Sequence, residues 1–279
     1  MTKTSGTSRA AHYNLSYGNF QADLYAEIRR EAFGEDIGQN SWHTAEEQDR
    51  FLTWLELSPG QKVLDVACGA GGPVLRMAAA TGCSVAGVDV HEQAIETARA
   101  LAKQRGLAER SEFHGADANG RLPFQDATFD AITCIDALNH FGDRLGMLSE
   151  WVRLLKPGGR VLFTDPIIVT GPLTNSEIAV RTSAGFYLIV PKGFDELVIA
   201  ESGLQLLLAQ DVTENMAKVG EGRRRARAAR RDALCKIEGD QAFEKEQAFL
   251  SVTGTLAREG RLSRYVFVAQ KSHAAPSPE

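Results

Sequence analysis

The chain has 279 residues, of which 43% are hydrophobic and 24% charged, and its formal net charge is −5. This length suits one large domain or a domain with a cap, and the composition excludes wholesale disorder. The acidic balance argues against a general nucleic-acid binder, which usually carries a basic excess. No apolar run approaches ~20 residues, so no membrane span is expected.

The cysteines and histidines show no metal-binding or disulfide pattern. Neither C-x-x-C nor H-E-x-x-H occurs among the four cysteines and six histidines. The first eleven residues lack the apolar stretch of a signal peptide. We therefore expect a cytoplasmic protein with reduced cysteines and no metal. Residues 1–11 and 272–279 are expected to form flexible tails.

Two helices are predicted before the first strand. Apolar residues recur at helical spacing over residues 21–33, and a second helix is expected over 41–57. Thr44 has the character of its N-cap, and the turn residues 58–60 end it. We expect residues 12–60 to form an N-terminal helical lid.

From Lys62 onward, short apolar strands alternate with helices. The expected strands are 63–67, 84–88, 111–115, 129–135 and 159–164, and the expected helices between them are 73–80, 92–105 and 144–155. Continuous apolar strands in this alternation are typical of a parallel sheet with helices on both faces. The sequence therefore predicts a doubly wound α/β core over residues 62–165.

The later part of the chain is less regular. The expected helices are 175–191, 194–202, 214–237 and 242–259, and the expected strands are 204–212 and 264–270. Six arginines lie between residues 223 and 231. A solvated helix face is the favoured interpretation of this cluster, and capture of an acidic acceptor is the alternative.

The segment 63–73 runs from a strand through a tight glycine turn into a helix. Glycines such as Gly69 and Gly71 are needed where the backbone takes positive φ or a ligand approaches closely. Asp65 is an acid in a buried strand and needs a hydrogen-bonding or functional reason. Asp89 ends the next strand, where its carboxylate could accept both hydroxyls of a ribose. The pattern predicts a nucleoside site.

A dinucleotide-binding turn fits this segment less well. The pattern G-x-G-x-x-G would need glycine at the position of Val74, and Pro73 has no N–H to offer a phosphate. A nucleoside without phosphate is favoured over NAD or FAD, which points to S-adenosylmethionine. A nicotinamide-dependent oxidoreductase and a catalytically silent nucleoside-binding scaffold are the alternatives.

Four motifs resemble those of class I S-adenosylmethionine-dependent methyltransferases. Their first motif is similar to V-L-D-V-A-C-G-A-G-G (63–72), and their second to V-A-G-V-D-V (85–90). Residues 122–130 resemble the approach to their fourth strand, and residues 154–159 the turn before the fifth. The stretch 34–39 resembles one in sarcosine/dimethylglycine N-methyltransferases. The chain looks most like this small-molecule group, which includes ubiquinone/menaquinone C-methyltransferases.

The resemblance implies a Rossmann-like, seven-stranded, mostly parallel sheet in the order 3-2-1-4-5-7-6, with the seventh strand antiparallel. It implies a methyltransferase domain over residues 61–271, with insertions 166–204 and 213–260 that build the acceptor pocket. The implied reaction is in-line methyl transfer from S-adenosylmethionine to N, O or C of a small metabolite, leaving S-adenosylhomocysteine. A homodimer is compatible with such lids, whereas nucleic acid and membrane are not expected partners.

The resemblance also assigns the cofactor. Asp89 would bind the ribose, the glycines would admit the methionyl part, and Asp65 would order its ammonium group. Asp117 and Ala118 would meet the adenine, and the carbonyl of Ile135 the ammonium. Plain alternatives are helix N-capping for the two later acids and loop ordering for Asp65. The implied cofactor residues are Asp65, Gly69, Gly71, Asp89, Val90, Asp117, Ala118, Ile135 and Gln39.

The acceptor side is expected to follow the fourth strand. His140 is the candidate general base, and a hydrogen-bonded structural histidine is the alternative. Aromatic residues could wall the acceptor and exclude water, or simply anchor their segments. The candidate acceptor-binding residues are Tyr17, Trp42, Asn139, His140, Phe186 and Tyr187, with Tyr13 as a further aromatic candidate.

Overall fold

Eight strands form one sheet in the computed structural model, which describes residues 17–183 and 185–273. The strand order is β3-β2-β1-β4-β5-β8-β7, and a two-residue strand, β6, lies beside β5. The strands are β1 (Lys62–Val66), β2 (Ser84–Asp89), β3 (Ser111–Gly115), β4 (Phe129–Cys134), β5 (Leu155–Val169), β6 (Val190–Pro191), β7 (Leu204–Asp211) and β8 (Leu262–Lys271). Only β8 runs antiparallel to the other strands, so the predicted order and the antiparallel last strand are confirmed.

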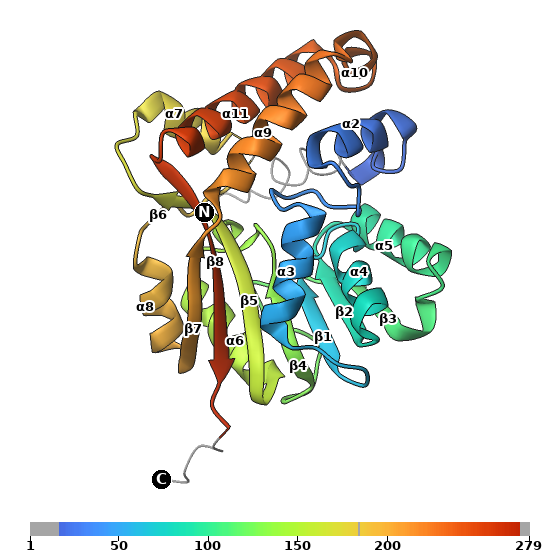
Figure 1. The fold of residues 1–279 in the computed structure, drawn as a ribbon, viewed down its shortest axis with the longest axis vertical. Helices are drawn as coiled ribbons and strands as arrows, with labels where there is room; N and C mark the ends of the chain where they lie inside the picture. Colours follow the sequence, from blue (N-terminus) through green and yellow to red (C-terminus); the bar gives the residue numbers. More distant parts are fainter. Residues whose placement is uncertain (1–16, 184, 274–279) are drawn as a thin grey trace, which may run out of the picture.

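Helices cover both faces of this sheet (Figure 1). The α-helices are α2 (Asp23–Phe33), α3 (Ala45–Leu55), α4 (Gly72–Thr81), α5 (Glu92–Gln104), α6 (Arg144–Leu154), α7 (Asn175–Arg181), α8 (Phe194–Glu201), α9 (Thr213–Ala228), α10 (Arg231–Glu238) and α11 (Asp240–Arg258). Short 3-10 helices are η1 (Ala108–Arg110) and η2 (Leu138–His140). Side chains of α3, α4 and α5 pack on one face, and those of α6 and α8 on the other. This is the doubly wound arrangement that the sequence predicts.

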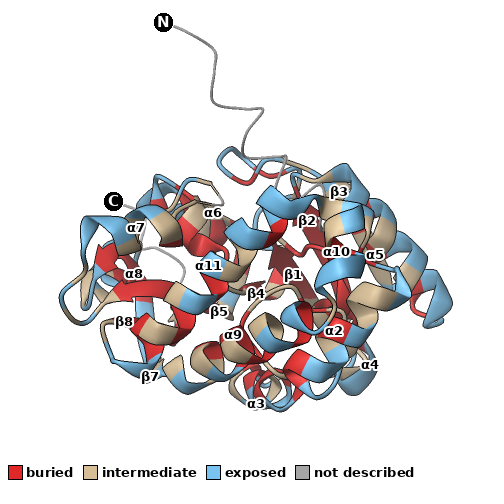
Figure 2. Cartoon of the chain, turned by 90° about the horizontal axis from the view of Figure 1, so that it is seen from above, coloured by how far each residue is buried: buried red, intermediate tan, exposed pale blue. Residues whose placement is uncertain are grey.

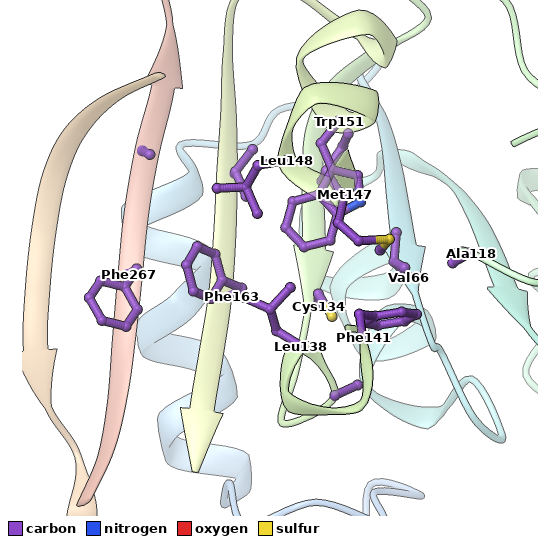
Figure 3. Close-up of a cluster of buried hydrophobic side chains, with 14 of the residues drawn as sticks. Val66, Ala118, Cys134, Leu138, Phe141, Met147, Leu148, Trp151, Phe163 and Phe267 are labelled. Carbon is purple, nitrogen blue, oxygen red and sulfur yellow. The ribbon is translucent and has the colours of Figure 1, made fainter. Parts of the chain in front are cut away.

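The core on the α6 side is built from alternating strand residues and large helical side chains. Trp151 and Leu148 of α6 lie over β4 and β5, close to Phe163 and Cys134 (Figure 3). All four are at most 1% exposed. Burying a side chain of this size contributes roughly 1.5–3 kcal/mol to the free energy of folding. The packing of α6 therefore stabilises the central strands of the sheet. Seen from above, the buried strands lie in the middle of the molecule, and the outer helix faces are exposed (Figure 2).

The N-terminal helices differ in what they cover. The hydroxyl of Thr44 accepts a hydrogen bond from the backbone N–H of Glu47, which confirms the predicted N-cap of α3. Phe51 and Leu55 of α3 pack with strand residues such as Val63, so α3 covers the sheet rather than the cavity edge. A lid can therefore comprise only the part of segment 12–60 that precedes α3. The two predicted tails and Tyr13 lie wholly or largely outside the described residues.

A group of helices, α2, α9, α10 and α11, gathers at the carboxyl ends of the parallel strands (top of Figure 1). Phe33 of α2 packs with Val219 of α9 and Phe249 of α11. The predicted single helix 214–237 is two helices, because the chain turns at Arg230 and α10 folds back onto α2 through Leu234.

The predicted helix 175–191 is also too long. The helix α7 ends at Arg181, and Gly185 has a φ of +157°, a backbone conformation that favours glycine. The chain then becomes extended, and Val190 pairs with Ile168 of β5.

The arginine cluster is ion-paired, so a plain solvated helix face does not describe it. The pairs are Arg223–Glu246, Arg224–Glu221, Arg225–Glu221, Arg227–Glu238, Arg230–Glu31 and Arg231–Glu244. Arg223 and Arg227 connect α9 to α11 and α10, Arg231 connects α10 to α11, and Arg230, between α9 and α10, pairs with Glu31 of α2. The cluster therefore joins the helices of this group to one another. Across the described residues, no helix combines the length and apolarity needed to cross a bilayer.

Candidate active site

A cavity of about 410 Å³ opens at the carboxyl ends of β1, β2 and β4. The strand order reverses between β1 and β4, and open α/β sheets bind ligands at such a point. Most of the candidate residues line this cavity: Tyr17, Asp65, Gly69, Asp89, Val90, Asp117, Ala118, Ile135, His140 and Phe186. The strand-end loops that the sequence singles out therefore do come together.

Asp89 organises the glycine loop. Its Oδ2 accepts a hydrogen bond from the backbone N–H of Gly69, and its Oδ1 accepts one from that of His91, both at 2.9 Å. The N-cap of α5 is His91, so N-capping does not explain this carboxylate. Burial raises the pKa of Asp89, while the two N–H donors act in the opposite direction. The carboxylate is thus fixed at the end of β2, where it faces the cavity.

The two glycines of the turn meet different surroundings. Gly69 has a φ of +54°, and a Cβ there would lie 2.7 Å from the hydroxyl oxygen of Tyr17. Tyr17 therefore covers the turn, as a cavity wall would. Gly71 has a φ of +76°, and its Cβ would instead meet the side chains of Ala98 and Phe113. Gly71 is not among the cavity-lining residues, so close packing accounts for glycine there.

Asp65 is buried and hydrogen-bonded at the cavity floor. Its Oδ1 accepts a hydrogen bond of 2.7 Å from the hydroxyl of Thr133, and the residue is 5% exposed. Burial raises the pKa of Asp65 to about 7; the hydroxyl of Thr133 opposes this shift, and the charge of Asp89 adds to it. A carboxyl group that titrates near neutrality can respond to a cation in the cavity.

The loop after β3 presents Asp117 at the cavity rim. Its Oδ1 accepts hydrogen bonds from the backbone N–H and the side-chain amide of Asn119, at 2.9 and 2.7 Å. No described α-helix begins in this loop, so Asp117 is not an N-cap. Ala118 is 7% exposed and joins the core beneath the loop. The two residues therefore stand at the edge of the cavity beside β2.

A second cavity of about 140 Å³ adjoins the first beneath the helix group. Four residues line both cavities: Asn40, Ser41, Asp136 and His140. Four other candidates line only the second: Gln39, Trp42, Asn139 and Tyr187. Gln39, which the resemblance assigns to the cofactor, accepts a hydrogen bond from the N–H of Ile37 and donates one to the carbonyl of Glu35. Its amide thus holds the turn before α3.

Asp136 lies in the segment after the fourth strand that is expected to line the cleft, but the sequence predicts no role for its side chain. Its backbone φ is +55°, which is uncommon for a residue other than glycine and marks local strain. Its Oδ1 accepts hydrogen bonds from the Thr164 hydroxyl and Arg264 Nε, and its Oδ2 accepts one from the Trp42 N–H. Arg264 also donates two hydrogen bonds to the carboxylate of Glu47. This buried network ties the segment before α3 to the loop after β4, and Asp136 lines both cavities.

His140 lies where the cavities meet. Its Nδ1 is 3.0 Å from the carbonyl oxygen of Phe186, and its ring centroid is 4.7 Å from that of Tyr187. Because a carbonyl can only accept, Nδ1 carries the proton in this contact, and the lone pair of the neutral ring is on Nε2. The structural contact of Nδ1 with the Phe186 carbonyl and a base function of Nε2 are therefore compatible in the same residue.

The fold is that of class I methyltransferases, and comparisons with known proteins agree. A family model described as a methyltransferase domain matches residues 63–159. The 27-O-demethylrifamycin SV methyltransferase of Amycolatopsis mediterranei is 30% identical over 235 residues, 78% of this chain and 85% of the relative. The chain belongs to the S-adenosylmethionine-dependent methyltransferases.

Two further comparisons extend this picture. The methyltransferase GfsG of Streptomyces halstedii is 36% identical over 172 residues, and the match covers 60% of each chain. The structure of a putative sarcosine dimethylglycine methyltransferase from Galdieria sulphuraria superimposes with a TM-score of 0.80 at 19% identity, over 95% of this chain and 99% of that one. The comparisons favour the methyltransferase over the oxidoreductase and scaffold alternatives.

Proposed function

We propose that the protein transfers a methyl group from S-adenosylmethionine to N, O or C of a small molecule, in the cytoplasm. The observation that carries this proposal is the junction of two cavities, one at the carboxyl ends of the parallel strands and one beneath the helix group. A methyl donor in the first cavity and an acceptor in the second would meet at the residues that line both. The printed name of the rifamycin relative also describes a small-molecule acceptor.

The first cavity offers a partner for each part of the cofactor. Asp89 would accept from the ribose hydroxyls, and Asp117 with Ala118 would bind the adenine. Asp65 and the carbonyl of Ile135 would face the ammonium group. In the transfer, a lone pair of the acceptor attacks the methyl carbon while the C–S bond breaks, and S-adenosylhomocysteine leaves. Positioning supplies much of the rate of such an in-line displacement.

The affinity for S-adenosylhomocysteine is expected to rise with pH between 6 and 8. A pKa of about 7 leaves Asp65 partly protonated in this range, and the ligand's ammonium group favours the ionised form. Below pH 7 affinity should fall by up to about tenfold per pH unit, and binding should release a proton. Titration calorimetry in buffers of different ionisation enthalpy measures both effects. Asp65→Asn should flatten the profile, and an unchanged profile in this variant would refute the role of Asp65.

His140 is proposed to take the acceptor proton on Nε2 or to orient the acceptor. We expect His140→Ala to lower turnover by about 10²–10⁴-fold for a hydroxyl acceptor, the usual contribution of a general base. Affinity for S-adenosylhomocysteine should change little, because the ring lies at the far end of the first cavity. His140→Gln, which keeps a side-chain polar group, separates orientation from proton transfer. Unchanged turnover in both variants would exclude His140 from catalysis.

The proposal as a whole is tested by a search for the acceptor. The purified protein is incubated with labelled S-adenosylmethionine and panels of amines, phenols, carboxylic acids and transfer RNA. Label in a small molecule, together with formation of S-adenosylhomocysteine, supports the proposal. Label confined to RNA would contradict it.

The homodimer stays a prediction, and light scattering on the protein as it elutes from a size-exclusion column measures its mass.

A further inference from the structure

Arg181, at the end of α7, is a buried cation in the second cavity. The residue is 2% exposed, and its Nη2 donates one hydrogen bond, to the carbonyl oxygen of Pro166. Within the described part of the chain, its Nε and Nη1 have no hydrogen-bond partner. Burying a charged group without a compensating partner is costly, so this arrangement is what a cavity prepared for an anion would show.

The other charges around this cavity are compensated. Arg29 pairs with Asp36, Arg223 with Glu246, and Arg227 with Glu238. The remaining acid in the lining, Asp136, is paired with Arg264. Arg181 is therefore the cavity cation without an acidic partner among residues 17–183 and 185–273. Arg181 brings one positive charge to the cavity, which matches a monoanion better than a phosphate monoester with its charge of about −1.5 to −2.

The surroundings of Arg181 are aromatic on several sides. Its guanidinium carbon lies 5.0 Å from the ring centroid of Phe249, 5.2 Å from that of Tyr187 and 6.0 Å from that of Trp42. These rings hold the guanidinium and also supply an apolar wall. Asn139, which is 1% exposed, adds an amide whose oxygen and nitrogen have no partner in the described structure.

The anion site is close to the place where the methyl group would arrive. The ring of Tyr187 contacts both the guanidinium of Arg181 and the ring of His140. A small molecule could therefore place an anionic group on Arg181 and a nucleophilic atom near His140.

We propose that the methyl acceptor of this protein carries a single carboxylate group, which Arg181 binds, and an apolar part that lies against Trp42, Tyr187 and Phe249. This inference rests on the proposed methyl transfer and names its substrate class. A carboxylate offers two oxygens to the unsatisfied N–H groups of the guanidinium, and such charge-assisted contacts are among the strongest hydrogen bonds in proteins.

The test is calorimetry on the protein saturated with S-adenosylhomocysteine. Benzoate is titrated at pH 7.5 beside benzamide, which has the same ring and shape but no charge, and beside phenyl phosphate. We expect benzoate to bind at least about tenfold more tightly than either. Arg181→Met should lose this advantage while its affinities for benzamide and S-adenosylhomocysteine stay the same. Arg181→Lys should keep part of it.

Arg261→Met is the matched control. Arg261 forms an ion pair with Glu177, which lies on α7, the same helix as Arg181. Arg261 itself is not among the lining residues of the second cavity. This variant should bind benzoate as the wild type does.

Several results would overturn the inference. These are equal affinities of the wild type for benzoate and benzamide, no binding of either, tighter binding of phenyl phosphate, or full benzoate affinity in Arg181→Met. If Arg181→Met does not fold, the three wild-type titrations and Arg181→Lys decide. Failure of the wild type to bind S-adenosylhomocysteine would count against the methyltransferase function itself, whereas the other outcomes bear on the carboxylate alone.

Discussion

Arg264→Met is expected to lower the free energy of unfolding by about 3–5 kcal/mol, the usual cost of breaking a buried ion pair by removing one partner. The side chains of Arg264 and Glu47 are 0% exposed and that of Asp136 is 3% exposed, so both carboxylates would be left in the interior with a major cationic partner removed. Burial alone would lower the pKa of Arg264, but the charges of Asp136 and Glu47 outweigh it and raise the pKa. Urea denaturation at pH 7.5 measures the effect.

Two further variants show whether burial is the cause. Arg261→Met removes a pair whose side chains are 22% and 21% exposed, and it should cost about 1 kcal/mol or less. The double variant Arg264→Met with Glu47→Leu replaces the buried pair by apolar groups and should recover part of the loss. A loss below about 1 kcal/mol in Arg264→Met would mean that the network does not hold α3 and the β4 loop together.

Asp89→Ala is expected to weaken S-adenosylhomocysteine binding by about ten- to a hundredfold, or about 1.4–2.7 kcal/mol. The carboxylate would lose its hydrogen bonds to the ribose, and hydrogen bonds to charged groups contribute about 1.5–3 kcal/mol. The variant also removes the acceptor for the N–H groups of Gly69 and His91, which loosens the glycine loop. Titration calorimetry measures the affinity.

Asp89→Asn serves as the control, since it keeps the shape and one acceptor oxygen. Its affinity should lie between those of the wild type and Asp89→Ala. Thermal unfolding of both variants shows whether the fold is kept. Wild-type affinity in Asp89→Ala would place the ribose elsewhere, and binding of NAD by the wild type would favour a dinucleotide site.

The sheet and the cofactor side could be predicted because their signals are local. Gly69 follows β1, and Asp89 ends β2, the next strand along the chain, with only α4 between the two strands. Because β1 and β2 pair in parallel, their carboxyl ends lie side by side. The same reasoning finds Asp65, which lies in β1, and Asp117, which follows β3; these strands flank β2 on its two sides. Gly71 shows the limit of this reasoning. The motif predicts a glycine at this position, but it does not reveal that the side chain of Phe113, rather than a ligand, fills the adjacent space.

The acceptor side could be predicted only in part, because it is assembled from residues far apart in the chain: Trp42, Asn139, His140 and Tyr187 line the second cavity as expected, but its charged groups were not foreseen. Arg181 follows no motif, and its partners in the cavity come from α11, the segment before α3 and the loop after β4. Arg264 and Asp136 are 128 positions apart, so no spacing rule links them. The break at Arg230 has no local signal for a related reason, since the ion pairs and apolar contacts that favour it are tertiary.

The most direct test of the account is a crystal structure of the protein with S-adenosylhomocysteine bound. We expect the ribose hydroxyls on Asp89, the adenine beside Asp117, and the sulfur facing the junction at His140 and Asp136. A sulfur atom directed away from the second cavity, or a nucleoside bound outside the first, would contradict the proposed path of the methyl group.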